Sequence, residues 1–213
     1  MSDLRPTIQA IQKEVGAVPD GVFGPVTAGL VLHQLQNAYV APAADKLRPA
    51  GEAAQATFDA RSEAVLATLD PKAVPLFRQF LALAKASAAT LGCDYVLISG
   101  NRTFAEQDAL YAQGRTKPGK IVTKARGGQS NHNFGIAADA GVFQGKVYLD
   151  DGTPEQWRLA SKVHKACSMH AAACGLEWGG SWSAIKDEPH FEVATGLSLA
   201  EKRQKFEREG SVL

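Results

Sequence analysis

The strongest pattern along the chain is a run of apolar residues at helical spacing in segment 74–91. Apolar side chains recur three and four positions apart there, Leu76 and Phe80 among them, as on the buried face of an amphipathic helix. Segments 104–113 and 154–174 are predicted to form two further helices. Together these segments supply the helical part of the predicted fold.

Short apolar runs predict the strands. Segment 95–99 lies between two glycines and is typical of a buried strand. Segments 136–143 and 146–149, separated by a turn, and a final strand at 190–193 complete the set. Because strands and helices do not alternate regularly, the sequence favours an α+β fold with a small antiparallel sheet flanked by helices.

The first quarter of the chain has a different character. Segment 7–37 predicts two short helices around a turn, and the stretch that follows is rich in alanine and proline, as linkers are. We therefore expect a small all-α module, a linker and a larger α+β domain. Their predicted limits are 1–40, 41–56 and 57–213.

Composition narrows the classes of partner. With 45% hydrophobic residues, 21% charged residues and a net charge of +1, the chain is an ordinary globular protein. This balance argues against nucleic-acid and membrane partners, and we expect a monomer. The N-terminus lacks the pattern of a secretory signal, which predicts synthesis in the cytoplasm. The three cysteines form no C-x-x-C pair and are expected to be unpaired thiols.

Two histidines and an aspartate are candidate metal ligands. His132 and Asp139 lie seven residues apart among small and apolar residues, where an unpaired Asp139 would be costly to bury. His190 lies at the start of a predicted apolar strand. Hydrolytic zinc sites use three ligands of these types and keep one position for water. A histidine and an aspartate at this spacing also occur by chance, so spacing alone does not decide for a metal.

The residues around these positions carry a recognisable motif. The pattern S-x-H-x-x-G-x-A-x-D over 130–139, followed by D-x-x-H over 187–190, resembles the family of zinc D-Ala-D-Ala carboxypeptidases and L-alanyl-D-glutamate endopeptidases, which includes phage endolysins. Segment 99–103 (SGNRT) is similar to the family's S-G-Y-R-S block, with Asn101 in place of the usual aromatic residue. Segment 178–182 (WGGSW) is similar to the endopeptidase branch in particular.

The resemblance implies a set of metal ligands. His132, Asp139 and His190 match the residues that hold one catalytic zinc ion in the family. Such an ion lowers the pKa of its bound water to about 7.

The resemblance also implies the residues that act beside the metal. Asp187 matches the acid that activates the water and later protonates the leaving amine. Arg102 matches the cation that polarises the scissile carbonyl and stabilises the developing oxyanion. Ser130 matches a residue near the substrate groove, and Trp178 and Trp182 are candidates to line it.

Several of these assignments have alternatives. Glu188 competes with Asp187, although neighbours on an extended segment point opposite ways. Arg102 could instead form a plain surface salt bridge, and both tryptophans could pack in the core. Glu192 shares a strand face with His190 and is either its hydrogen-bond partner or a solvated side chain. The other histidines, His33, His164 and His170, are expected to be structural or solvated.

The N-terminal segment has a resemblance of its own. The pattern D-G-x-F-G-P-x-T over 20–27 is similar to the turn of a small three-helix peptidoglycan-binding domain. Its glycines supply the backbone freedom that the turn between helices needs. A small helical cap on the catalytic domain is the alternative interpretation.

Three functions follow from these resemblances. The leading hypothesis is a zinc endopeptidase that cleaves the L-Ala–D-Glu bond of peptidoglycan stems, released to the wall at lysis. The alternatives are a D-Ala-D-Ala carboxypeptidase and a zinc-containing wall-binding protein without catalysis. Carboxypeptidase relatives more often carry glutamate as the acid, and a silent relative would have lost it, so the presence of Asp187 favours the endopeptidase.

Overall fold

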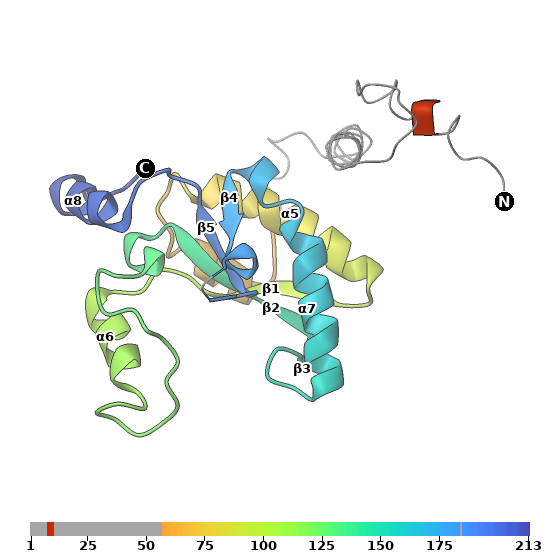
Figure 1. Ribbon diagram of the computed structural model, residues 1–213, viewed down its shortest axis with the longest axis horizontal. Helices are drawn as coiled ribbons and strands as arrows, with labels where there is room; N and C mark the ends of the chain where they lie inside the picture. The colour runs from red at the N-terminus through yellow and green to blue at the C-terminus, as the bar shows by residue number, and fades with distance from the viewer. Residues whose placement is uncertain (1–7, 11–56, 184) are drawn as a thin grey trace. The chain divides into compact units, whose positions relative to one another are not determined.

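The computed structural model describes residues 8–10, 57–183 and 185–213 (Figure 1). The chain divides into two units, Met1–Ala50 and Gly51–Leu213, of which the second carries the fold described below. Residues 8–10 are helical. The rest of the predicted N-terminal module and linker, with His33, lies outside the described residues.

The larger unit is built on one antiparallel sheet of five strands. Its path runs β1-β2-β5-β4, and β3 pairs with β2 beside this path. The strands are β1 (Asp94–Ser99), β2 (Ala137–Gln144), β3 (Val147–Tyr148), β4 (Leu176–Trp178) and β5 (His190–Val193). Together with the helices around it, this sheet confirms the α+β class predicted for the larger domain.

Five α-helices accompany the sheet (Figure 1). α5 packs against both β1 and α7, and α4 packs against β1. Within the described part of the chain, no helix is both long and apolar enough to cross a membrane. The helices are α4 (Ala60–Leu66), α5 (Val74–Thr90), α6 (Phe104–Ala112), α7 (Pro154–Ser168) and α8 (Leu199–Glu209).

Four elements depart from the sequence-based expectation. The helix predicted over 154–174 ends at Ser168, and a short 3-10 turn, η2 (Ala172–Cys174), follows before Gly175 turns the chain with a φ of 73°. β4 occupies a glycine-containing stretch for which no strand was predicted; Leu176 is buried there and pairs with Val193. α4 and α8 had no predicted counterpart.

The core lies between the helices and one face of the sheet. Phe80 of α5 packs on Phe191 of β5 with ring centroids 4.4 Å apart. The hydroxyl of Tyr95 lies 2.7 Å from Nδ1 of the buried His164, whose Nε2 lies 2.6 Å from Oδ1 of Asp150. His164 is therefore structural, as predicted, and all three cysteines are buried and unpaired.

The register of the central strands determines where the polar residues lie. Ala138 and Ala140 of β2 are buried in the core, so Asp139 between them points to the other face of the sheet. Asp139 is the register partner of His190 on β5 and of Ser99 on β1. Residues far apart in the sequence thus meet on the face of the sheet opposite the core.

Candidate metal centre and active site

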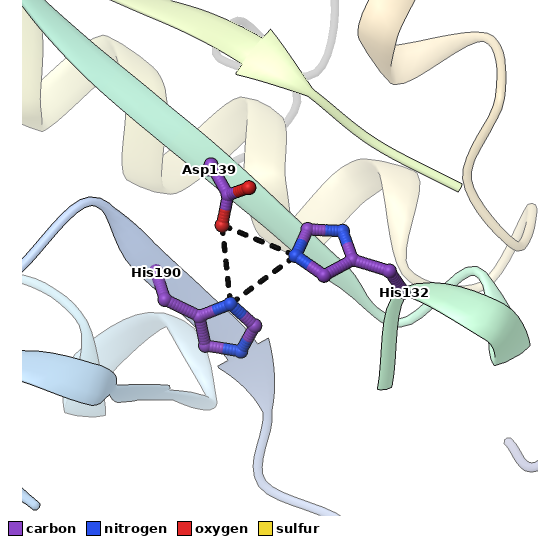
Figure 2. A group of neighbouring side chains, drawn as sticks. All are labelled: His132, Asp139 and His190. Carbon is purple, nitrogen blue, oxygen red and sulfur yellow. Dashed lines mark hydrogen bonds and ion pairs between the residues drawn. The ribbon is translucent and has the colours of Figure 1, made fainter. Parts of the chain in front are cut away.

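Three side chains converge on this face (Figure 2). His132 comes from a 3-10 turn, η1 (Asn131–Phe134), Asp139 from β2 and His190 from β5. Oδ1 of Asp139 lies 3.1 Å from Nε2 of His132 and 3.1 Å from Nδ1 of His190. The two imidazole nitrogens are 3.2 Å apart. The structure therefore brings the three predicted ligands together around one point.

The far side of each imidazole is held by an acceptor. Nδ1 of His132 lies 2.7 Å from the carbonyl oxygen of Gly100, and Nε2 of His190 lies 3.0 Å from Oε2 of Glu192. When these nitrogens donate to the acceptors, the neutral rings turn the lone pairs of Nε2 of His132 and Nδ1 of His190 toward Asp139. Two lone pairs and a carboxylate at one point repel each other unless a cation lies between them. The donor set and its outer acceptors fit zinc.

The charges at this point shift the pKa values of Asp139 and His190. Burial disfavours the carboxylate of Asp139, but the imidazoles of His132 and His190 outweigh it and hold its pKa below the ordinary value. Burial also lowers the pKa of His190, yet hydrogen bonds and charge from Asp139 and Glu192 raise it to about 9. Protons and a metal ion therefore compete for the same atoms.

Glu192 is in turn held by the C-terminal helix. It is buried, and its Oε1 lies 3.9 Å from Nζ of Lys202 on α8. Lys202 is also buried, and its Nζ donates to Oδ1 of Asn131 at 3.1 Å. Of the two roles considered for Glu192, the structure places it in contact with His190. Nothing in the sequence pattern indicated Lys202, because α8 had no predicted counterpart.

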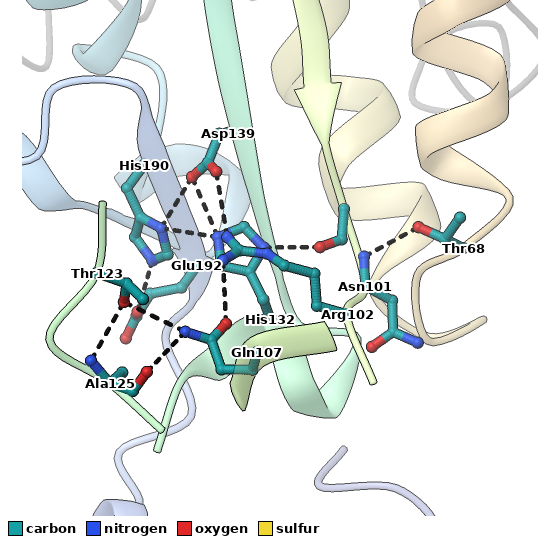
Figure 3. A network of polar contacts seen from close by, with 11 residues as sticks. Thr68, Asn101, Arg102, Gln107, Thr123, Ala125, His132, Asp139, His190 and Glu192 are labelled. Atoms are coloured by element: carbon teal, nitrogen blue, oxygen red, sulfur yellow. Dashed lines mark hydrogen bonds and ion pairs between the residues drawn. The ribbon is translucent and has the colours of Figure 1, made fainter. Parts of the chain in front are cut away.

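Arg102 extends this network from the end of β1 (Figure 3). Its Nη2 lies 3.4 Å from Oδ2 of Asp139, and its Nη1 donates to Oε1 of Gln107 at 3.0 Å. Gln107 belongs to α6 and is fully buried. Nothing in the sequence pattern indicated Gln107, since a glutamine on a short helix is ordinarily solvated.

Asp187 and Glu188 lie on different sides of the chain. Asp187 lines the pocket above the metal centre, whereas Oε1 of Glu188 accepts a hydrogen bond from Ser161 on α7 at 2.8 Å. Partial burial of its carboxyl and the negative charge of Asp139 raise the pKa of Asp187. The residue as a whole is exposed, so solvent limits this effect. A carboxyl with a raised pKa at this place is suited to proton transfer.

The pocket is an open cavity of about 900 Å³ with the metal centre in its wall. Ser130 lines it, and so does Trp182, whose ring centroid is 5.1 Å from that of His190. Trp178 is not among the lining residues: its ring packs against the core, and its Nε1 donates to the carbonyl oxygen of Glu188 at 2.7 Å. Of the two predicted tryptophans, the structure brings only Trp182 to the pocket.

The chain is similar to known cell-wall peptidases. A family model described as D-alanyl-D-alanine carboxypeptidase matches residues 123–193. Among solved structures, the L-Ala D-Glu endopeptidase ChiX of Serratia marcescens is 26% identical with a TM-score of 0.43, covering 64% of this chain and 88% of its own. The vancomycin-resistance D,D-pentapeptidase VanY, in complex with Zn(II), is 18% identical with a TM-score of 0.40, covering 67% and 80%.

A curated relative provides the stronger likeness. Over 127 residues the chain is 42% identical to the peptidoglycan L-alanyl-D-glutamate endopeptidase CwlK of Bacillus subtilis. The match covers 56% of this chain and 72% of that relative, and it extends well beyond the short motifs around the metal centre. On this likeness the chain belongs to the D-Ala-D-Ala carboxypeptidase and L-alanyl-D-glutamate endopeptidase family of peptidases.

Proposed function

We propose that this protein is a zinc-dependent peptidoglycan peptidase that cleaves the L-Ala–D-Glu bond of the stem peptide. The observation that carries the proposal is the convergence of His132, Asp139 and His190 in the wall of a cavity that also contains Asp187 and Arg102. The activity named for the relative CwlK supports the choice of bond.

Each residue of the centre has a proposed role. His132, Asp139 and His190 hold the metal, and bound zinc supplies the Lewis acidity that makes water a nucleophile near neutral pH. Asp187 takes a proton from the attacking water and passes it to the leaving amine of D-Glu. Its place at the pocket wall leaves the carboxylate open to both water and substrate.

Arg102 is proposed to bind the oxygen of the scissile carbonyl. The ion pair with Asp139 and the hydrogen bond to Gln107 fix its guanidinium before the substrate arrives. A fixed cation stabilises the negative charge that develops on the carbonyl oxygen more effectively than a mobile one. Ser130 and Trp182, which also line the cavity, are proposed to contact the peptide stem.

Digestion of purified peptidoglycan tests the proposal. The zinc-loaded protein is expected to release fragments with new L-Ala C-termini and D-Glu N-termini, identified by mass spectrometry. The Asp187→Ala variant is expected to keep zinc and release none. Release of free D-Ala instead would indicate a D-Ala-D-Ala carboxypeptidase, and zinc binding without hydrolysis would indicate a wall-binding protein.

We also propose that residues 1–40 bind the wall. A binding module joined to a peptidase raises the effective concentration of the enzyme at an insoluble substrate. The peptidoglycan-binding turn pattern over 20–27 supports this role. Co-sedimentation with insoluble peptidoglycan tests it: the full chain is expected to sediment more completely than a chain of residues 57–213.

A further inference from the structure

Part of the cavity wall comes from a segment that has no acidic residues and contributes one cation to the lining. No aspartate or glutamate occurs between Asp108 and Asp139. The cations of this stretch are Arg115, Lys117, Lys120, Lys124 and Arg126. A wall of this composition favours an anionic ligand if one of the cations faces the cavity and is free to pair.

Among these cations, Lys124 is the one that lines the cavity. The guanidinium groups of Arg115 and Arg126 lie over the ring of Tyr111, at 3.9 and 4.8 Å from its centroid. Lys117, Lys120 and Lys124 are all exposed, and of these three only Lys124 is among the residues that line the cavity. No ion pair or hydrogen bond of the Lys124 ammonium is present in the part of the chain that the structure describes.

The residues on both sides of Lys124 are held by one buried amide, which bonds the side chain of Thr123 and the backbone of Ala125 (Figure 3). Nε2 of Gln107 donates to Oγ1 of Thr123 at 3.2 Å and to the carbonyl oxygen of Ala125 at 2.9 Å. The same side chain accepts the hydrogen bond from Arg102. Gln107 therefore holds the base of Lys124 and the guanidinium of Arg102 in one arrangement.

Arg102 and Lys124 are the lysine and arginine side chains in the lining of the cavity. Both terminal nitrogens of Arg102 already have partners, Gln107 and Asp139. Because Arg102 is assigned to the scissile carbonyl oxygen, Lys124 is the cavity cation that remains for a substrate carboxylate. A flexible ammonium suits this task, since it pairs with a single anionic group without the fixed geometry of a guanidinium.

The proposed substrate has such a group next to the bond that is cleaved. Glutamate has two carboxyl groups and one amine. In the L-Ala–D-Glu bond the amine is acylated, and only one carboxyl continues the chain, so the other remains as a free carboxylate. The residue on the leaving side of the scissile bond is therefore anionic.

We propose that Lys124 binds this free carboxylate and makes the enzyme selective for stems whose glutamate is not amidated. This inference rests on the proposed endopeptidase function and names the residue that distinguishes a charged from an amidated glutamate on the leaving side. Lys124 is a specificity residue here and takes no part in proton transfer.

Two defined stem peptides test the inference, one with the free carboxylate and one with that group converted to a primary amide. With the zinc-loaded full chain, kcat/KM is expected to be higher for the carboxylate peptide by roughly 2- to 5-fold at low salt, as an exposed charge pair allows. Lys124→Gln is expected to abolish this preference and Lys124→Arg to retain it. Lys120→Gln, on the same segment but away from the cavity, is the matched control and is expected to behave as the wild type.

The outcomes separate the two proposals. If the wild type cleaves both peptides and the preference is the same in Lys124→Gln, the inference is wrong while the endopeptidase function stands. The same holds if the wild type shows no preference. If the wild type cleaves neither peptide between L-Ala and D-Glu, the proposed function fails and the inference fails with it.

Discussion

Nε2 of His190 lies 3.0 Å from Oε2 of Glu192, two residues further along the same strand. Side chains two apart on a strand share a face, so the strand itself sets this contact. The carboxylate holds the proton on Nε2 and leaves Nδ1 free to bind a metal. A contact within β5 thereby determines the tautomer of His190, a proposed metal ligand on the same strand.

Glu192→Gln is expected to weaken zinc binding. The variant removes the negative charge that keeps Nε2 of His190 protonated, and partners of this kind contribute about 10- to 100-fold in metal affinity. Competition with a chromophoric chelator measures the change. Glu188→Gln, whose carboxylate contacts Ser161 away from the centre, is the matched control. Equal zinc affinity in Glu192→Gln and the wild type would contradict the assigned role.

Lys202→Met is expected to weaken zinc binding through Glu192. Lys202 contacts Glu192 and Asn131 and is not among the cavity residues. In a double-mutant cycle, the variant that carries both Lys202→Met and Glu192→Gln should therefore lose less zinc affinity than the sum of the two single losses. Lys205→Met, on the same helix with its Nζ bonded to the carbonyl oxygen of Val212, controls for the helix itself. Full additivity would show that Lys202 acts by another route.

Asp187→Asn is expected to keep zinc and lose turnover. Asparagine keeps the size of the side chain but cannot carry the proton, and general acid–base catalysis contributes about 10²- to 10⁴-fold. Zinc content by elemental analysis and kcat on a defined stem peptide are the two measurements. Glu188→Gln again serves as the control and should retain kcat. A kcat within a few-fold of the wild type in Asp187→Asn would assign the proton transfer to another group.

Arg102→Lys is expected to lower kcat despite the retained charge. Lysine lacks the fork that reaches Oε1 of Gln107 and Oδ2 of Asp139 at once, so the cation is no longer fixed. Removal of one oxyanion donor costs about 10²- to 10³-fold in kcat, and we expect a loss of this order. Steady-state kinetics on the same peptide measure it, with zinc content as the check on the centre. An unchanged kcat would leave only an electrostatic role for Arg102.

Asp59→Ala is expected to destabilise the fold in a pH-dependent way. Oδ1 of Asp59 accepts from the backbone N–H of Ser62 and caps α4 at 2.9 Å. Burial raises the pKa of Asp59, but the hydrogen bonds from Ser62 and the charge of Lys85 outweigh it and hold the pKa below its ordinary value. A cap of this kind contributes about 1 kcal/mol at neutral pH.

The sign of that pH dependence follows from the lowered pKa. The folded state binds a proton on Asp59 more weakly than the unfolded state does. The stabilisation is therefore present above a pH of about 4 and is lost as the pH falls through the pKa that Asp59 has in the folded state. Denaturant titrations at several pH values should show that the difference in free energy of unfolding between the wild type and Asp59→Ala shrinks as the pH is lowered. Asp151→Ala, which removes an exposed acid, should show no such trend. A difference independent of pH would exclude an ionised cap.

Local pattern in the sequence was sufficient for most elements of the larger domain. The periodic run over 74–91 and the apolar runs at 95–99 and 190–193 became α5, β1 and β5, because burial on one face imposes a period on the chain. The motif residues of the centre were likewise identified from the sequence, through its resemblance to the family. Their zinc and catalytic roles remain proposals that the variants above test.

Only the tertiary structure decided which neighbours those residues have. His132 contacts the carbonyl oxygen of Gly100, and Glu192 contacts Lys202 of a helix that no pattern had predicted. Trp178 and Trp182 looked equivalent in the sequence, yet one packs in the core and the other faces the cavity. Periodicity reports which face of an element is buried. It carries no information on which distant segment lies against that face, and the chemistry of the centre depends on those distant contacts.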